Sequence, residues 1–122
     1  MPLANEYQVM FEQLAAAGPA PSVRDLPVAD GRNLYRAARA VNLDLPIHRV
    51  SNALLPGPGG DIPIRIYQPQ GGGPFGILVY FHGGGWVIGD LDTADAVCRE
   101  IATLAEDIVV SVDYRLAPDH VY

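Results

Sequence analysis

Two uninterrupted apolar runs limit the fold of this chain more than any other feature. Residues 77–81 read ILVYF and residues 108–112 read IVVSV, without the polar alternation of a half-buried strand. Such runs are typical of strands that are covered on both faces of a parallel sheet. The segment between them, DTADAVCREIATLAED, carries apolar residues at helical spacing. We therefore predict a right-handed strand, helix, strand crossover with parallel strands, which places the chain in the α/β class.

Two further strands are expected ahead of this crossover. The stretches IHRVSNALL and DIPIRIYQP, on either side of the turn sequence PGPGG at residues 56–60, favour an antiparallel pair. Pro63 has no N–H group to donate, which predicts that the second strand lies at a sheet edge or carries a bulge. In the crossover helix, Asp92 or Thr93 is expected to cap the start.

Two helices are predicted before the strands. NEYQVMFEQLAAAG, residues 5–18, has an amphipathic pattern that stops at Gly18, and GRNLYRAARAV, residues 31–41, indicates a shorter helix. The apolar positions are Tyr7, Met10, Phe11, Leu14 and Ala15 in the first helix and Leu34, Tyr35, Ala38 and Val41 in the second, where Arg32, Arg36 and Arg39 face the other way.

Composition excludes several classes of protein. The 122 residues are 49% apolar and carry a net charge of −6, which indicates a globular chain, and every basic residue is an arginine. Neither a nucleic-acid surface nor a lysine-containing phosphate loop is therefore expected. The single cysteine, Cys98, falls on the apolar face of its helix, where a core role is favoured over a nucleophile. No metal-binding motif is present, and we expect no metal or cofactor.

The N-terminal sequence MPLANEYQVM lacks the basic and apolar regions of a signal peptide. No apolar stretch approaches the roughly 18 residues of a membrane-spanning helix. We expect a cytoplasmic protein without a membrane span.

Three consecutive glycines follow the first apolar run, in the stretch YFHGGGWVIGD at residues 80–90. A simple turn requires only one glycine. A dinucleotide-binding loop requires a glycine three residues after Gly85, where this chain has Ile88. Successive N–H groups without neighbouring side chains can instead converge on an anion, as an oxyanion hole requires. Phe81 and Trp86, on either side of the glycines, would keep water away from it.

Two motifs carry a family resemblance. FHGGGWVIGDLDT at residues 81–93 and VVSVDYRLAPDH at residues 109–120 resemble the hormone-sensitive-lipase-like esterases of the α/β-hydrolase fold, in which HGGG is the oxyanion motif. The resemblance implies a cap at residues 1–45 and the first four strands of the core at residues 46–122. It implies N–H donors at Gly83 and Gly84, a loop shaped by Gly85, and a structural His82. Asp113, Tyr114 and Arg115 would support the loop, although an ion pair without such a role is the alternative.

The attacking part of an esterase is missing from this sequence. Such enzymes use a serine within G-x-S-x-G, followed by an acid and a histidine. None of the three serines, Ser22, Ser51 and Ser111, lies in that motif. Ser111 is expected to be buried within a strand, and His48 and His120 are expected to be ordinary surface or satisfied histidines. We interpret the chain as the N-terminal third of an esterase, with a truncation or frameshift near His120.

The leading functional prediction is therefore a cofactor-free carboxylic ester hydrolase that acts on short-to-medium acyl esters, with the 122-residue chain inactive alone. The alternatives are a non-catalytic receptor that binds small molecules and complementation by a separate chain. Without the strand that carries the nucleophile, the strand at residues 77–81 would expose an apolar edge. We therefore expect self-association or poor solubility.

Overall fold

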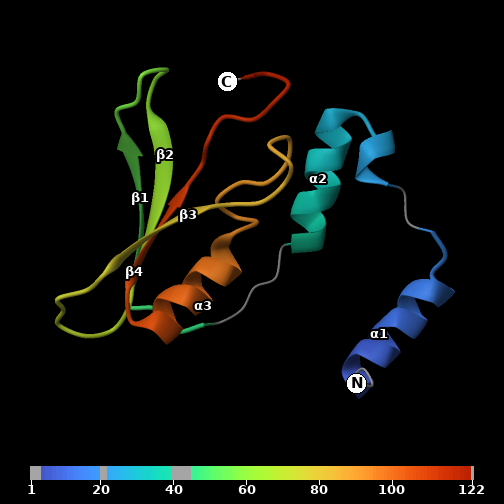
Figure 1. Cartoon of the computed structure of the whole chain (residues 1–122), viewed down its shortest axis with the longest axis horizontal. Coiled ribbons are helices and arrows are strands. Elements are labelled where there is room, and N and C mark those ends of the chain that lie inside the picture. The colour runs from blue at the N-terminus through green and yellow to red at the C-terminus, as the bar shows by residue number, and fades with distance from the viewer. Residues whose placement is uncertain (1–3, 20–21, 40–44, 122) are drawn as a thin grey trace.

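The computed structural model describes residues 4–19, 22–39 and 45–121, which form a mixed sheet with helices beside it (Figure 1). The elements are α1 (Asn5–Ala16), the short 3-10 helix η1 (Val23–Asp25), α2 (Val28–Arg39), β1 (Arg49–Leu55), β2 (Ile62–Gln68), β3 (Ile77–Phe81), α3 (Asp95–Ala105) and β4 (Ile108–Val112). Helix α3 lies against the sheet, whereas α2 lies beside the loop that leaves β3, and α1 is farthest from the sheet.

The sheet has the strand order β1-β2-β4-β3. β1 pairs with β2 and β2 pairs with β4 in the antiparallel sense, whereas β3 and β4 are parallel, with Ile77 opposite Ile108 and Phe81 opposite Val112. The predicted α/β class, the antiparallel first pair and the parallel crossover strands are confirmed. The carboxyl ends of β3 and β4 consequently meet at one end of the sheet.

Strand β2 corrects the prediction made from Pro63, because β2 lies inside the sheet and not at its edge. The ladder between β2 and β4 begins with Ile64 opposite Val112, so Pro63 stands just beyond it. The missing N–H group costs the sheet little at that point, and the Pro63 carbonyl still accepts a hydrogen bond from the Asp113 N–H at 2.9 Å. An interior strand tolerates proline where its ladder ends.

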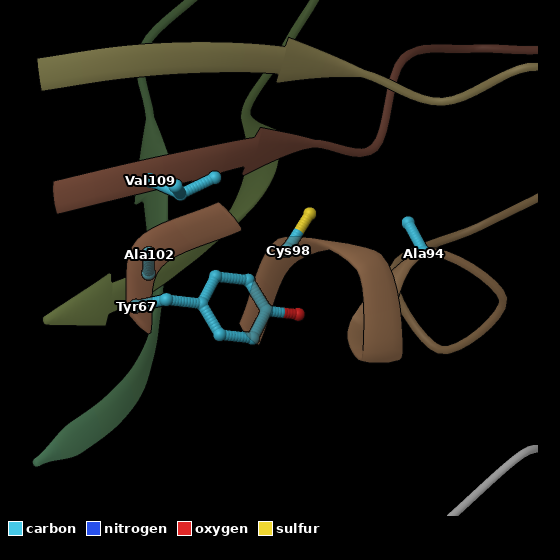
Figure 2. Close-up of a cluster of buried hydrophobic side chains, with 5 residues drawn as sticks. All are labelled: Tyr67, Ala94, Cys98, Ala102 and Val109. Atoms are coloured by element: carbon cyan, nitrogen blue, oxygen red, sulfur yellow. The ribbon is translucent and has the colours of Figure 1, made fainter. Parts of the chain in front are cut away.

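The core lies between α3 and the sheet (Figure 2). Three small residues of the helix, Ala94, Cys98 and Ala102, are buried four positions apart and so form one stripe. Tyr67 of β2 and Val109 of β4 are fully buried against them. Because the helix stripe is small, the Tyr67 ring fits beneath it. The apolar spacing predicted for this helix is confirmed at these positions.

A carboxylate anchors the start of α3 to the sheet. Asp95 accepts hydrogen bonds from the Tyr67 hydroxyl at 2.9 Å and from Arg99 Nε at 2.6 Å, and Arg65 Nη1 lies 3.2 Å from it. Burial opposes ionisation of Asp95, but the hydrogen bonds from Arg99 and Tyr67 outweigh it and lower the pKa of the carboxyl.

The predicted cap of α3 is wrong. The helix begins at Asp95, and its N-cap, Ala94, makes no side-chain hydrogen bond. Asp92 pairs with Arg65 at 2.9 Å, and Thr93 exchanges hydrogen bonds with Asp90, including Thr93 N–H to Asp90 Oδ1 at 2.9 Å. Both candidate caps therefore stabilise the turn before the helix.

The burial predicted for β3 is also wrong. Tyr80 is the one residue of β3 that is not exposed, and it packs against the core, whereas Leu78 is 38% exposed. On the other face Ile77 is 70% exposed, and Val79 and Phe81 are exposed as well. The apolar run indicates that both faces are suited to burial, but no described element covers the second face.

The two N-terminal helices form as predicted, although α2 starts earlier, at Val28, and Val41 lies outside the described residues. In α1 the apolar side chains Tyr7, Met10, Phe11 and Leu14 are exposed. Two arginines of α2 bond to the rest of the molecule. Arg32 donates to the Val87 carbonyl at 2.9 Å, and Arg36 pairs with Asp90.

Replacement of Asp95 by asparagine is expected to lower the free energy of unfolding by about 1–3 kcal/mol at pH 7, because charged hydrogen bonds are lost. The folded pKa of Asp95 is lowered, so its contribution is present above the ordinary aspartate range and disappears as the pH falls through the folded value. Urea unfolding from pH 7 to about 3 measures this, with exposed Asp61 changed to asparagine as control. An equal loss at every pH would contradict the assignment.

The bare edge at β3 is expected to cause concentration-dependent association in size-exclusion chromatography. A charged residue on an edge strand opposes such pairing, so Val79→Lys is expected to shift the chain toward monomer. Leu54→Lys, an exposed position on the opposite edge strand β1, is the matched control and should not. A native chain that elutes as a single monomer at all concentrations would contradict this prediction.

Candidate functional site

The loop that leaves β3 depends on glycine at specific positions. Gly84, Gly85 and Gly89 have φ angles of 137°, 59° and 102°, in the region that favours glycine. A Cβ atom added at Gly84 would overlap the Ile88 carbonyl, whereas a Cβ at Gly83 would meet nothing within 4 Å. The triple glycine therefore combines a conformational requirement at Gly84 with open space beside Gly83.

The N–H groups of the three consecutive glycines have no acceptor among the described residues. The loop closes on itself through hydrogen bonds from the N–H groups of Val87 and Ile88 to the Gly84 carbonyl, at 3.2 and 3.1 Å. Within the part of the chain that the structure describes, the N–H groups of residues 83–85 form no hydrogen bond. Backbone donors without a partner are uncommon unless water or a ligand completes them.

These donors border a pocket of about 380 Å³ at the end of the sheet. Its lining consists of Phe81, His82, Gly83, Gly84, Gly85, Trp86 and Tyr114. Phe81 and Trp86 contribute apolar surface on either side of the glycines and are 64% and 75% exposed. That they keep water away from the glycines stays a prediction. A pocket with unpaired N–H donors and apolar walls is suited to an anion or a developing oxyanion.

His82 lines this pocket and is 5% exposed. Its Nδ1 atom is 3.0 Å from the Gly83 carbonyl, and its Nε2 atom is 3.9 Å from a carboxylate oxygen of Asp113. Burial raises the pKa of Asp113, an effect that the nearby His82 partly offsets. The imidazole is thus enclosed between the loop and the end of β4. Its role as a support for the loop stays a prediction.

Tyr114 joins the ends of the two parallel strands. Its hydroxyl donates to the His82 carbonyl at 2.5 Å, and its ring stacks on the imidazole with the centroids 4.3 Å apart. Burial raises the pKa of the Tyr114 phenol, so the group stays a donor at neutral pH. Arg115 turns elsewhere, since its Nη1 atom is 3.4 Å from the Gly59 carbonyl. Of the three clustered residues, Asp113 and Tyr114 contact His82 and Arg115 does not.

Comparison with known proteins shows which proteins this chain is similar to. A family profile described as alpha/beta hydrolase fold matches residues 78–122. The chain is 55% identical over 71 residues to the carboxylic ester hydrolase LipN of Mycobacterium tuberculosis, covering 58% of this chain and 19% of LipN. It is 35% identical over 115 residues to the acetyl esterase of Salmonella schwarzengrund, covering 93% of this chain and 34% of that protein.

A solved esterase from Pyrobaculum calidifontis matches the whole fold, with a TM-score of 0.85 and 40% identity over 100% of this chain and 39% of the esterase. The chain has part of the α/β-hydrolase fold and is similar to esterases of that fold. The resemblance given by the two sequence motifs is thereby confirmed. The chain spans less than two fifths of the relatives named here. None of its described helices is long and apolar enough to cross a membrane.

None of the other candidate nucleophiles and bases lines this pocket. Ser111 is fully buried in β4. Cys98 lies in α3 and is buried in the core, where burial raises the pKa of its thiol to about 11. His48 and His120 are exposed. The described residues contain no cluster of side chains that could hold a metal ion.

The sequence analysis missed the residues of α2 that hold the site. Arg32 reaches the Val87 and Ala117 carbonyls, and Arg36 pairs with Asp90, which closes the turn with Thr93. The two arginines are four residues apart and so share one face of the helix. That shared face was predicted from the sequence, but its contacts with the loop after β3 were not.

The two neighbouring glycines are expected to respond differently to alanine. Gly84→Ala is expected to destabilise the chain by about 2–4 kcal/mol, because the methyl group meets the Ile88 carbonyl and the φ angle of 137° is unfavourable. Gly83→Ala is expected to change stability by less than about 1 kcal/mol, since its methyl group enters open space. Urea unfolding monitored by circular dichroism measures both. Similar losses for the two variants would contradict this description of the loop.

Proposed function

We propose that this chain supplies the oxyanion-binding part of a carboxylic ester hydrolase. The observation that carries the proposal is the set of unpaired N–H groups at Gly83, Gly84 and Gly85 in an apolar-walled pocket. When a serine attacks an ester carbonyl, the carbonyl oxygen becomes an oxyanion that needs donors at about 2.7–3.1 Å. Gly83 and Gly84 are proposed as these donors, and Gly85 as the residue that shapes the loop.

The proposed contribution is electrostatic. Removal of one oxyanion donor costs roughly 100- to 1,000-fold in the rate of the chemical step. Fixed N–H groups achieve this because they require no reorientation when the charge develops. His82 and Tyr114 would hold the glycine backbone in place through the hydrogen bond from the Tyr114 hydroxyl to the His82 carbonyl.

The serine, the acid and the histidine of this mechanism are proposed to come from outside the 122 residues. No G-x-S-x-G motif occurs in the chain, and the relatives are much longer than it is. The isolated chain is therefore expected to be inactive toward esters. The missing groups could be continuous with this sequence or belong to a complementing chain.

The substrate is proposed to be a short-to-medium acyl ester. Names of the relatives, carboxylic ester hydrolase and acetyl esterase, support the ester class. A second pocket of about 530 Å³ lies on the other side of the glycine loop, and its apolar lining from the N-terminal segment includes Val23, Leu26 and Val28. This second pocket supports a division into a cap at residues 1–45 and a core at residues 46–122. No cofactor enters the proposed reaction.

A chimera tests the proposed function. The segment of the Pyrobaculum calidifontis esterase that this chain matches, 39% of that protein, is replaced by residues 1–122, and hydrolysis of p-nitrophenyl butyrate is measured. We expect an active chimera in which Gly83→Ala lowers kcat about 100-fold, because the methyl group occupies the space beside the donors. Gly72→Ala is the matched control, since its added methyl group also meets open space, outside the pocket.

Two outcomes would contradict the proposal. Full activity of the Gly83→Ala chimera would contradict the proposal, because the added methyl group would then leave unaffected the space that the oxyanion is proposed to occupy. Serine-dependent hydrolysis by the isolated 122-residue chain would show that the nucleophile lies within it. A folded isolated chain that binds the ester without cleaving it, together with an inactive chimera, would favour the non-catalytic receptor instead.

A further inference from the structure

We propose that Arg32 of α2 is a positioning residue for the glycine loop, so that the N-terminal segment sets the geometry of the N–H donors. The catalytic meaning of this role rests on the proposed function. The structural part, that one guanidinium holds the loop in its observed conformation, stands on the contacts of Arg32 alone.

The guanidinium of Arg32 joins two segments far apart in the sequence. Its Nε atom donates to the Val87 carbonyl at 2.9 Å, and its Nη2 atom donates to the Ala117 carbonyl and to Asp119 Oδ2, both at 3.0 Å. Those two segments also bond to each other, because the Ala117 N–H donates to the Trp86 carbonyl at 2.8 Å. Arg32 therefore closes a network around the exit of the glycine loop.

No other described donor bonds to the two carbonyls that accept from Arg32. The carbonyls of Val87 and Ala117 each accept a hydrogen bond from Arg32 and, within residues 4–19, 22–39 and 45–121, from nothing else. The Arg32 side chain is only 25% exposed. Hydrogen bonds from a charged donor are about twice as strong as neutral ones, and only a planar guanidinium presents several donors in fixed directions.

The loop needs such support where Arg32 meets it. Trp86 has a φ angle of 62°, in the left-handed region that costs a non-glycine residue roughly 1–2 kcal/mol. A residue keeps that conformation only where its surroundings impose it. The Trp86 carbonyl is held by Ala117, and the next carbonyl, that of Val87, is held by Arg32. Both bonds act directly after Gly85, the last of the three consecutive glycines.

Helix α2 is attached to the rest of the chain at a second point, so the role of Arg32 can be tested separately from the docking of the whole helix. One turn later, Arg36 pairs with Asp90, beyond the glycine loop. Figure 1 shows α2 running beside this part of the chain. Arg39, on the same helix, lies over the Tyr35 ring with its guanidinium carbon 5.4 Å from the centroid. Arg39→Gln is thus a matched control that removes a charge from α2 without touching the loop.

Residue-resolved hydrogen exchange of the 122-residue chain tests the proposal. The informative amides are those of Val87, Ile88 and Ala117, whose hydrogen bonds define the loop, and the amide of Cys98 in α3 reports the core. In Arg32→Gln we expect protection to fall about tenfold at the loop amides and to stay unchanged at Cys98. Arg32→Lys should restore part of the protection, because a single ammonium can serve one of the carbonyls. Arg39→Gln should change neither group.

Unchanged protection at the loop amides of Arg32→Gln would overturn the proposal. An equal loss at Cys98, complete unfolding included, would also overturn it, because Arg32 would then stabilise the whole chain without positioning the loop. In the active chimera we expect Arg32→Gln to lower kcat while KM changes little. A chimera that is inactive with Arg32 intact would count against the proposed function and leave the exchange result standing, so the two failures are distinguishable.

Discussion

Parallel pairing of β3 with β4 is the constraint on which the rest of the site depends. The pairing runs from Ile77 opposite Ile108 to Phe81 opposite Val112, so the residues that follow each strand emerge side by side. His82 leaves one strand and Tyr114 follows the other, and their contact is possible only because the two exits are neighbours. An antiparallel pair would send these residues to opposite ends of the sheet.

Arginine side chains supply most of the connections between elements. Arg32 and Arg36 tie α2 to the loop after β3, and Arg65 and Arg99 hold Asp95 at the start of α3. The chain has no lysine, and its net charge is −6, so carboxylates are plentiful, and each of these four guanidinium groups pairs with at least one of them. A planar fork can hold a carboxylate and a carbonyl together, which a single ammonium does less well.

The sequence predicted those features that depend on local pattern. The strands, the helices, the parallel crossover and the buried stripe of α3 follow from periodicity, and the loop was located by its glycines. The burial of β3 could not be predicted, because an apolar run shows what a strand is suited to and not whether another element covers it. Pro63 misled for a similar reason, since its effect depends on where the ladder with β4 begins. The arginine face of α2 was predicted, but its contacts were not, because its partners lie more than fifty residues away.

Residues of this chain alone fix the geometry of the candidate site. One face of β3 is bare, and within the described residues the buried atoms His82 Nε2 and Ser111 Oγ have no hydrogen-bond partner. The glycine loop is nevertheless held by hydrogen bonds to the Gly84 carbonyl. The Tyr114 hydroxyl donates to the His82 carbonyl before the loop, and Arg32 donates to the Val87 carbonyl after it. All of these contacts are made by residues of the same chain. The donors at Gly83 and Gly84 can therefore be arranged before any nucleophile is added, because a preorganised anion site needs its backbone fixed and does not need the group that creates the charge.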